Sequence, residues 1–395
     1  ADTSDGLKLT ADASGEIDLQ SAGVTQAKIT SSGLQNASGN PITSQSGKNL
    51  IINGNMQIAQ RATSVTGITS SGGAYFTVDR FAYALSSGGG TWTQSQEADA
   101  PEGFGTSLKL SCTATGTFGA TTNWNALYQP IEGFNLQQLK YGTANAESLT
   151  VSFWVKSNKT GTYSILYYAS DNARAIASEY TILSANTWEK KTITIVGDTS
   201  GIINNDNGTG LSFYFTLASG SLRQSNALQT SWGAYDINGS VSSSQVQLGG
   251  SVSDYLQITG VQLEANTTAT PFEYLQYGQQ LALCQRYYFV LCNGSIAARQ
   301  SIGIGAYYSS SDLRGTFSFP TTMRATPTLE VETVTDGYDF RRVNGVDRVS
   351  SFALLDASLT SVNFNNNTNA SGTAGTAGEL FSDDVSAFLA VSAEL

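Results

Sequence analysis

Carboxylates and aromatic rings are the side chains with which this 395-residue chain could do chemistry, because the sequence contains no histidine. A Ser-His-Asp triad, a Cys-His nucleophile and a histidine-ligated zinc site are therefore all excluded. The cysteines, Cys112, Cys284 and Cys292, match no zinc or redox spacing and are too few for a disulfide framework. We interpret them as small buried hydrophobic residues, consistent with assembly in a reducing cytoplasm.

The acidic, amide-rich segment 198–210 is a candidate for a Ca²⁺ site. Asp198 and Asp206 offer hard oxygen ligands, but the segment lacks the glutamate and the spacing of an EF-hand loop. Its Asn-Gly and Asp-Asn pairs are also ordinary turn residues, and we favour a turn. We predict no metal and no cofactor. Asp79 and Arg80 are interpreted as an internal ion pair that fixes the first strands.

Sugar recognition is the chemistry that the aromatic residues suit. A flat ring packs on the apolar face of a pyranose, and nearby amides or carboxylates bond its hydroxyls. The rings in polar, loop-like surroundings or on the polar side of a strand are candidates for glycan contact: Trp92, Trp124, Tyr128, Trp154, Trp232 and Tyr235. A place in the core or at a subunit interface is the alternative for each ring, and for Trp154 we favour a three-fold interface.

Composition predicts an all-β protein. The chain has 40 glycines, 10% aromatic residues and only 13% charged residues, whereas a helical enzyme would carry more Lys, Glu and Leu. Its formal net charge of −11 argues against binding to nucleic acid or to an anionic bilayer surface. No run of about 18 apolar residues is present, so we expect no membrane insertion.

Alternating apolar and polar residues locate the strands. In segment 149–157, Leu149, Val151, Phe153 and Val155 are predicted on one face, with Trp154 on the other. Segments with the same pattern recur between Gly- and Asn-rich turns, which is typical of a sandwich. We predict a jelly-roll β-sandwich over residues 50–275. Residues 1–49 have too few apolar residues to form a core alone, so they are either a loose tail or a shaft wrapped with identical chains.

A helical connector is predicted over residues 276–288. Its apolar stripe, at i, i+4, i+7 and i+11, is Tyr277, Leu281, Cys284 and Tyr288. Because so short a helix is only marginally stable by itself, we expect the stripe to be the interface of a homotrimer.

Residues 289–395 contain several short strand candidates that continue to the last residues. They predict a second sandwich with its final strand paired. The polar segments 334–345 and 363–380 are predicted to be long loops, and binding specificity tends to lie in such loops. The candidate contacts at this tip are Tyr338, Phe340, Arg341 and Arg342.

The order of several motifs resembles bacteriophage tail-fibre or fibre-like virion proteins. The motifs are NLIINGNMQIAQR at 49–61, VDRF at 78–81, LTVSFWVKS at 149–157, GVQLE at 260–264, ATPFEY at 269–274, CQRYY at 284–288 and FSFPTTMRATPTLEV at 317–331. The resemblance implies a trimeric, non-enzymatic virion fibre with a domain like a jelly-roll carbohydrate-binding module. It also implies docking to other virion proteins through residues 1–49, and attachment to a host surface polysaccharide.

Three alternatives stay open at this point. A head fibre or capsid decoration protein would share the same sandwiches, and the resemblance does not separate head from tail. A glycan depolymerase would need two carboxylates about 5–10 Å apart in a groove, and fibre depolymerases usually have long β-helical repeats, which we do not find. A secreted carbohydrate-binding module would also have this sandwich, and we would expect an export signal.

Overall fold

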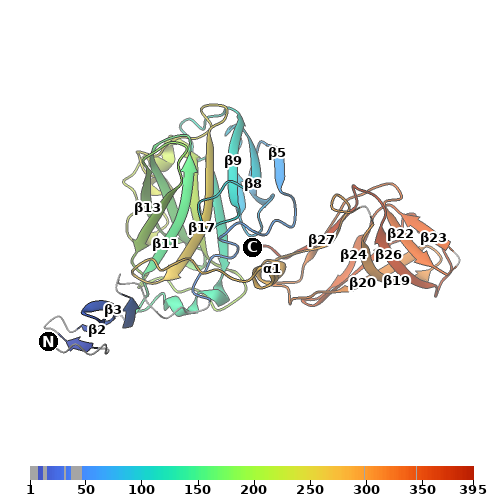
Figure 1. Cartoon of the computed structure of the whole chain (residues 1–395). Coiled ribbons are helices and arrows are strands. Elements are labelled where there is room, and N and C mark those ends of the chain that lie inside the picture. The colour runs from blue at the N-terminus through green and yellow to red at the C-terminus, as the bar shows by residue number, and fades with distance from the viewer. Residues whose placement is uncertain (1–7, 12–15, 31–32, 37–46, 298, 344) are drawn as a thin grey trace.

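The computed structural model describes residues 8–11, 16–30, 33–36, 47–297, 299–343 and 345–395, which form two β-sandwiches joined at a short helix (Figure 1). The all-β class predicted from composition is confirmed, since these residues form antiparallel sheets and a single short α-helix. Within these ranges no helix is long and apolar enough to cross a bilayer.

Two antiparallel sheets build the larger sandwich. Sheet I has the strand order β16-β13-β12-β15-β10-β7-β6, and sheet II has the order β14-β11-β17-β9-β8-β5. The strands of sheet I are β6 (Ser71–Tyr75), β7 (Ala82–Leu85), β10 (Trp124–Glu132), β12 (Gly161–Ala169), β13 (Arg174–Ile182), β15 (Thr209–Ser219) and β16 (Gly233–Ala234). The strands of sheet II are β5 (Ser64–Ile68), β8 (Thr91–Glu97), β9 (Ser107–Ala114), β11 (Leu149–Ser157), β14 (Glu189–Ile195) and β17 (Tyr255–Ala265).

The core lies between these sheets, as the alternation in β11 predicts. Leu149, Val151, Phe153 and Val155 are all fully buried in it. Phe153 of sheet II meets Phe215 of sheet I edge to face, with ring centroids 5.0 Å apart. Fully burying one such side chain contributes about 1.5–3 kcal/mol, so this shared core holds the sheets together.

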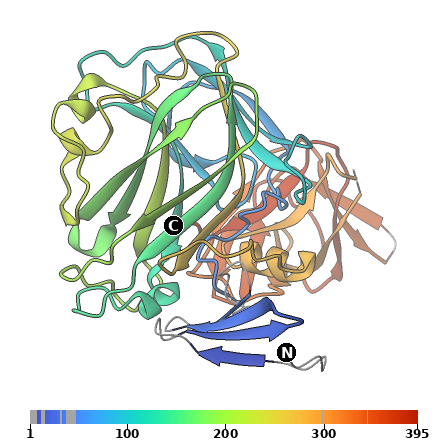
Figure 2. The ribbon, with the colours of Figure 1, turned by 60° about the vertical axis from the view of Figure 1, so that its left-hand side comes forward.

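A four-stranded sheet precedes the larger sandwich and lies beside it (Figure 2). Its strands are β1 (Lys8–Ala11), β2 (Ile17–Ser21), β3 (Val24–Thr30) and β4 (Gly33–Asn36). Val24 and Ile29 are exposed on it, as expected for a segment with little core of its own. The rest of the predicted anchor over 1–49 lies largely outside the described residues.

The predicted connector contains helix α1 (Tyr277–Gln285), which is shorter than residues 276–288. A capping box between Gln276 and Gln279 begins it. Tyr288 already belongs to strand β18 (Tyr288–Asn293). Cys284 and Tyr288 are buried within the single chain, whereas Tyr277 is 56% exposed. Half of the predicted trimer stripe is therefore covered by the chain itself.

The smaller sandwich contains a three-stranded and a seven-stranded sheet. Sheet III has the order β18-β27-β21, and sheet IV has the order β23-β22-β26-β19-β20-β25-β24. The strands not yet bounded are β19 (Ser301–Ser309), β20 (Asp312–Ser318), β21 (Thr328–Val331), β22 (Tyr338–Arg342), β23 (Gly345–Val349), β24 (Ala353–Ala357), β25 (Ser361–Asn366), β26 (Ala377–Ser382) and β27 (Phe388–Ser392). The expected pairing of the last strand is confirmed, because β27 pairs with both β18 and β21.

The prediction of a long loop is wrong for segment 334–345, which contains strand β22. It is partly right for segment 363–380, because residues 367–376 connect β25 to β26, although the ends of the segment belong to those strands. Asp339 and Arg341 of β22 lie on the outer face of sheet IV, so this strand has the composition of a loop.

The end of the chain returns to lie between the two sandwiches (Figure 1). Charged side chains hold the sandwiches together at this place. The Arg80 guanidinium, 1% exposed, forms an ion pair with Glu394, and Arg61 lies 3.3 Å from the same carboxylate. A second ion pair at the junction joins Arg286, which follows helix α1, to buried Glu132 of β10 at 2.5 Å. The predicted pair of Asp79 with Arg80 is wrong. Neighbouring side chains in a non-helical segment point in different directions, and Asp79 accepts hydrogen bonds from Gln60 instead.

Candidate glycan-binding face

A row of side chains crosses the outer face of sheet I. Tyr214 on β15 pairs with Tyr128 on β10, Tyr128 pairs with Ala82 on β7, and Ala82 pairs with Tyr75 on β6. Direct cross-strand partners share one face of a sheet. Phe213 and Phe215, which flank Tyr214, are buried in the core, so Tyr214 must point outward.

Three rings in this region stack into what we call the aromatic ladder: Trp124, Tyr214 and Tyr128. The rings of Tyr128 and Tyr214 are 4.5 Å apart and nearly parallel, and Trp124 lies 5.0 Å from Tyr214. All three are half-buried, so part of each side chain remains accessible to solvent. Such a surface offers apolar contact to a sugar ring and hydrogen-bonding groups to its hydroxyls.

An arginine supports the Trp124 end of the ladder. The Arg223 guanidinium lies 4.1 Å from the centre of the Trp124 ring, and its Nη1 donates to Tyr235 Oη at 2.9 Å. Tyr235 in turn meets Tyr168 of β12 edge to face, with centroids 5.2 Å apart. Arg223 itself is buried, so it fixes the rings and leaves little of its charge on the surface.

The phenols of the ladder stay uncharged. Burial raises the pKa of Tyr128 above its usual range and raises that of Tyr214 as well. At neutral pH both hydroxyls therefore donate and accept hydrogen bonds, as sugar hydroxyls require.

Glycine at position 73 leaves room for the Tyr128 hydroxyl. A Cβ at Gly73 would lie 2.2 Å from Tyr128 Oη, and the residue has a φ of +114°, a region that L side chains rarely adopt. Gly73 thus sets the position of the outermost ring of the ladder.

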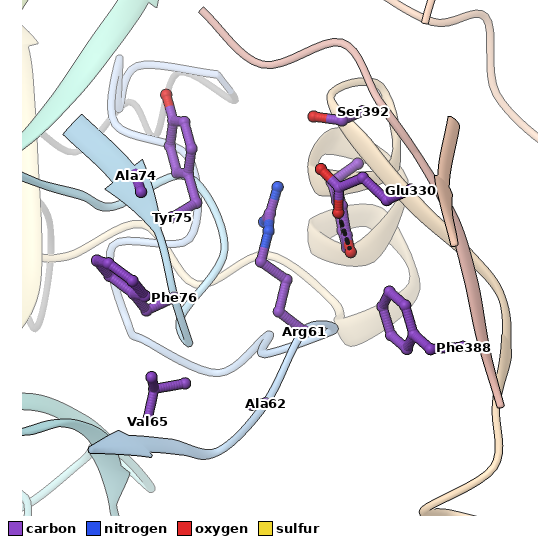
Figure 3. A pocket seen from close by; sticks show the side chains of 10 residues that line it. Arg61, Ala62, Val65, Ala74, Tyr75, Phe76, Glu330, Phe388 and Ser392 are labelled. Atoms are coloured by element: carbon purple, nitrogen blue, oxygen red, sulfur yellow. Dashed lines mark hydrogen bonds between the residues drawn. The ribbon is translucent and has the colours of Figure 1, made fainter. Parts of the chain in front are cut away.

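A hollow of about 300 Å³ opens at the loop edge beyond Trp124. Phe118, Gln224 and Gln247 are among its lining residues, and so is Ser219, the cross-strand partner of Trp124. A second hollow, of about 450 Å³, lies between the two sandwiches beyond Tyr75. Its lining residues come from both sandwiches (Figure 3).

In this second hollow, the Arg61 side chain extends between Tyr75 on one side and Glu330 on the other (Figure 3). Its guanidinium lies 3.4 Å from the centre of the Tyr288 ring, and Tyr288 Oη donates to Glu330 at 3.0 Å. The ladder and the two hollows thus lie along the larger sandwich and at its junction with the smaller sandwich.

The structure brings together three of the ring residues predicted from sequence, Trp124, Tyr128 and Tyr235. Trp92 is a wrong candidate for contact, since it is fully buried and its Nε1 donates to the Gly89 carbonyl at 2.8 Å. Trp154 lies apart on the outer face of sheet II, half-buried.

Trp232 also lies apart from the ladder. It packs edge to face on Tyr141, and its Nε1 donates to the Val196 carbonyl. Tyr214 and Tyr168 belong to the aromatic face but were not predicted. The signal for Tyr214 was the alternation in LSFYFTLASG, where one tyrosine lies between two phenylalanines.

The tip candidates separate onto two faces. Tyr338 and Phe340 are fully buried in the smaller sandwich, so they are wrong as surface contacts. Arg342 forms a two-point ion pair with Asp347 at 2.7 and 2.8 Å. Arg341 points to the opposite, outer face of sheet IV, because successive strand residues alternate.

The segment proposed as a possible Ca²⁺ loop uses its carboxylates internally. Asp198 is bonded by Arg174 through two nitrogens, at 2.6 and 2.9 Å. Burial alone would raise the pKa of Asp198, but the Arg174 and backbone hydrogen bonds outweigh it and the pKa lies below the usual range. Asp206 accepts from the Gly208 amide, which is the turn geometry that we favoured.

Comparisons with known proteins find only distant likenesses. No protein-family model and no curated protein sequence matches the chain. The enzymatically active domain of bacteriophage CBA120 tailspike protein 4 aligns over 55% of this chain and 21% of the tailspike chain, with 14% identity and a TM-score of 0.30. The alignment thus spans about a fifth of that tailspike chain.

Carbohydrate-binding modules give similar values. A family 11 module from Clostridium thermocellum, in complex with a β-1,3-1,4-mixed-linked tetrasaccharide, aligns over 53% of this chain and 99% of its own, with 12% identity and a TM-score of 0.26. The tandem CBM22 domain of Paenibacillus barcinonensis Xyn10C aligns over 89% and 98%, with 10% identity and a TM-score of 0.28.

Proposed function

We propose that this protein is a non-enzymatic phage virion fibre that attaches to a glycan on the host cell surface. The observation that carries the proposal is the aromatic ladder on the outer face of sheet I. Half-buried rings, uncharged phenols and a supporting arginine form a surface suited to sugars.

The resemblance of the motif order in the sequence to phage fibre proteins supports the virion role. In this role the N-terminal segment docks the fibre to other virion proteins, and the sandwiches extend away from the particle. A homotrimer presents three ladders, so that weak single sites act together through avidity. Tail and head placement are distinguished by electron microscopy of particles labelled with antibody against the chain. Labelling of neither tail nor head would reject the virion role.

The absence of enzymatic activity is proposed from chemistry. The chain has no histidine, and the ladder consists of rings and hydroxyls, whereas glycoside hydrolysis uses a pair of carboxylates. The purified protein should release no reducing ends from any polysaccharide that it binds. Release that is lost on substituting a particular Asp or Glu would show a depolymerase instead.

Binding itself is tested with a panel of purified bacterial capsular and lipopolysaccharide glycans. We expect the wild-type chain to be retarded by at least one of them in affinity electrophoresis. Tyr128→Ala should weaken this retardation, whereas Leu183→Ala, which removes an exposed side chain outside the ladder, should not. Failure of every glycan, or equal effects of both substitutions, would overturn the proposal.

A further inference from the structure

Three arginines converge on the outer face of sheet IV in the smaller sandwich. Arg299, Arg341 and Arg348 all lie near the carboxylate of Asp339, at 3.9, 3.4 and 3.4 Å. Their side chains are 46%, 38% and 57% exposed, whereas Asp339 is 2% exposed. Three charged groups that reach solvent therefore surround one carboxylate that does not.

Among the described residues, these guanidinium groups have few acceptors within hydrogen-bonding distance. A guanidinium has five N–H donors and forms its best bonds to oxyanions at about 2.7–2.9 Å, as parallel pairs. Arg342 shows that geometry with Asp347 on the opposite face. By contrast, the contacts to Asp339 are all 3.4 Å or longer, and Arg348 reaches Asp383 only at 3.6 Å.

An aromatic platform lies on the same face, next to the arginines. The Arg341 position on β22 pairs with Glu379 on β26, and Glu379 pairs with Ile304 on β19. Two strand spacings, about 10 Å, therefore separate Arg341 from the β19 side chains, and Arg348 on β23 lies one strand further away. There, a hollow of about 600 Å³ is lined by Ile304, Tyr308 and Arg314.

The platform is open to solvent. Tyr308 is 69% exposed and Ile304 is 72% exposed. The Arg314 guanidinium lies 3.6 Å from the centre of the Tyr308 ring and braces it from one side. Exposed apolar side chains beside a charged cluster on one sheet face are a feature of binding surfaces.

We propose that the outer face of sheet IV is a second binding site, which takes an acidic saccharide. Tyr308 and Ile304 contact a sugar ring, and Arg299, Arg341 and Arg348 bind an oxyanion on a neighbouring unit. The oxyanion is a uronic-acid carboxylate or a backbone phosphate, which guanidinium forks recognise in the same way. This site goes beyond the proposed function, because it uses none of the ladder residues and acts on the other sandwich.

The experiment measures binding of the full chain to three oligomers of equal length by isothermal titration: an oligogalacturonate, a glycerol-phosphate oligomer and a neutral galactose oligomer. We expect an acidic oligomer to bind more tightly than the neutral one, and to weaken as salt is raised. The acid that binds identifies the source of the oxyanion. Binding of neither acid, or equal binding of the neutral oligomer, overturns the proposal.

Two variants and a matched control locate the site. Arg348→Ala should weaken acid binding about tenfold, because a hydrogen bond to a charged group is lost. Arg348→Lys keeps the charge but not the fork and should recover only part of the affinity. Arg342→Ala removes the same charge from the same hairpin on the opposite face and should leave binding unchanged.

Equal losses in Arg348→Ala and Arg342→Ala would show a general charge effect and reject the site. The thermal unfolding midpoint of each variant confirms that it is folded. Tyr128→Ala tests the two sites separately, because it disrupts the ladder and leaves the acid site intact. It should therefore weaken binding of the glycan and leave binding of the acidic oligomer unchanged.

Discussion

At the scale of single residues, the buried charges of the junction are the features with the largest energetic consequences. Arg80 is enclosed by the carboxylate of Glu394, the Pro130 carbonyl and the Tyr287 ring. A charge in such a place is tolerated only because it is paired, and removing one partner leaves the other buried and uncompensated. Glu394 therefore joins the end of the chain to the larger sandwich.

Glu394→Gln should lower the free energy of unfolding by about 3 kcal/mol or more, because Arg80 and Arg61 both lose their carboxylate partner. The exposed pair of Lys140 and Glu147 supplies the control. Glu147→Gln should cost less than about 1 kcal/mol. Urea unfolding followed by tryptophan fluorescence measures the unfolding free energy of both variants. Similar losses would show that the junction pair contributes no more to stability than the exposed pair.

Asp79 should make stability depend on pH in an unusual direction. Burial raises its pKa to about 6, against the lowering effects of Arg61 and Gln60. An unfolded aspartate releases its proton near pH 4, at a pKa of about 3.9. Between these values the folded state binds more protons than the unfolded state, so this group makes stability fall as pH rises from about 4 to about 6.

Asp79→Asn removes that dependence. Relative to wild type, the variant should therefore gain stability between pH 4.5 and pH 7, by about 2 kcal/mol. Urea midpoints at the two pH values test this, since all other titrating groups are common to both chains. A difference between variant and wild type that does not change with pH would contradict the raised pKa.

At the scale of elements, strand alternation decides which rings face solvent. Tyr214 lies outward because Phe213 and Phe215 on either side of it are buried in the core, and Tyr128 shares its face because the two residues are cross-strand partners. The ladder is therefore a consequence of register between β10 and β15 and not of any local motif.

Gly73→Ala should disturb the ladder through the neighbouring edge of the sheet. The new methyl group would collide with Tyr128 Oη in a backbone conformation that alanine disfavours. We expect a loss of about 1 kcal/mol or more in stability and weaker glycan binding. Gly72→Ala on the same strand meets no atom within 4 Å and should change neither. If the two variants behave alike, Gly73 does not position the ring.

Sequence reasoning predicted elements better than it predicted contacts. The alternation in β11 and the final strand β27 were visible in the residue pattern, because burial on one face requires apolar residues at every second position. Trp92 was misassigned because its polar neighbours GGGTWTQSQ look like a loop, whereas the segment is a buried strand of sheet II.

Partners distant in sequence could not be predicted in this way. The pairing of Arg80 with Glu394 joins residues more than 300 positions apart, and nothing local to VDRF indicates it. Arg341 and Arg342 differ in role only because they alternate across a strand that the sequence presents as a loop. Such assignments depend on tertiary register, which a single sequence does not display.

At the scale of the whole molecule, ion pairs at the junction join the two sandwiches, and each sandwich carries one of the two proposed binding faces. Trimer formation would multiply each face by three. Tyr277 on α1 is exposed and apolar, and together with the half-buried Leu281 it is what remains of the predicted interface stripe.

Light scattering should therefore give a mass three times the 41.6 kDa of the chain. Tyr277→Asp should shift the protein toward the monomer by placing a charge in the interface, whereas Leu183→Asp, at an exposed site on the larger sandwich, should not. A monomeric wild type at micromolar concentration would end the trimer prediction.

The proposed binding of glycan to the aromatic ladder is tested most directly by the affinity of the ladder variants. The ligand is the glycan identified in the panel. Isothermal titration of wild type, Trp124→Ala and Tyr128→Ala should give about tenfold weaker binding for each variant, since each loses one ring contact. Leu183→Ala should bind like wild type. Wild-type affinity in both ladder variants, with the proteins folded, would contradict the account.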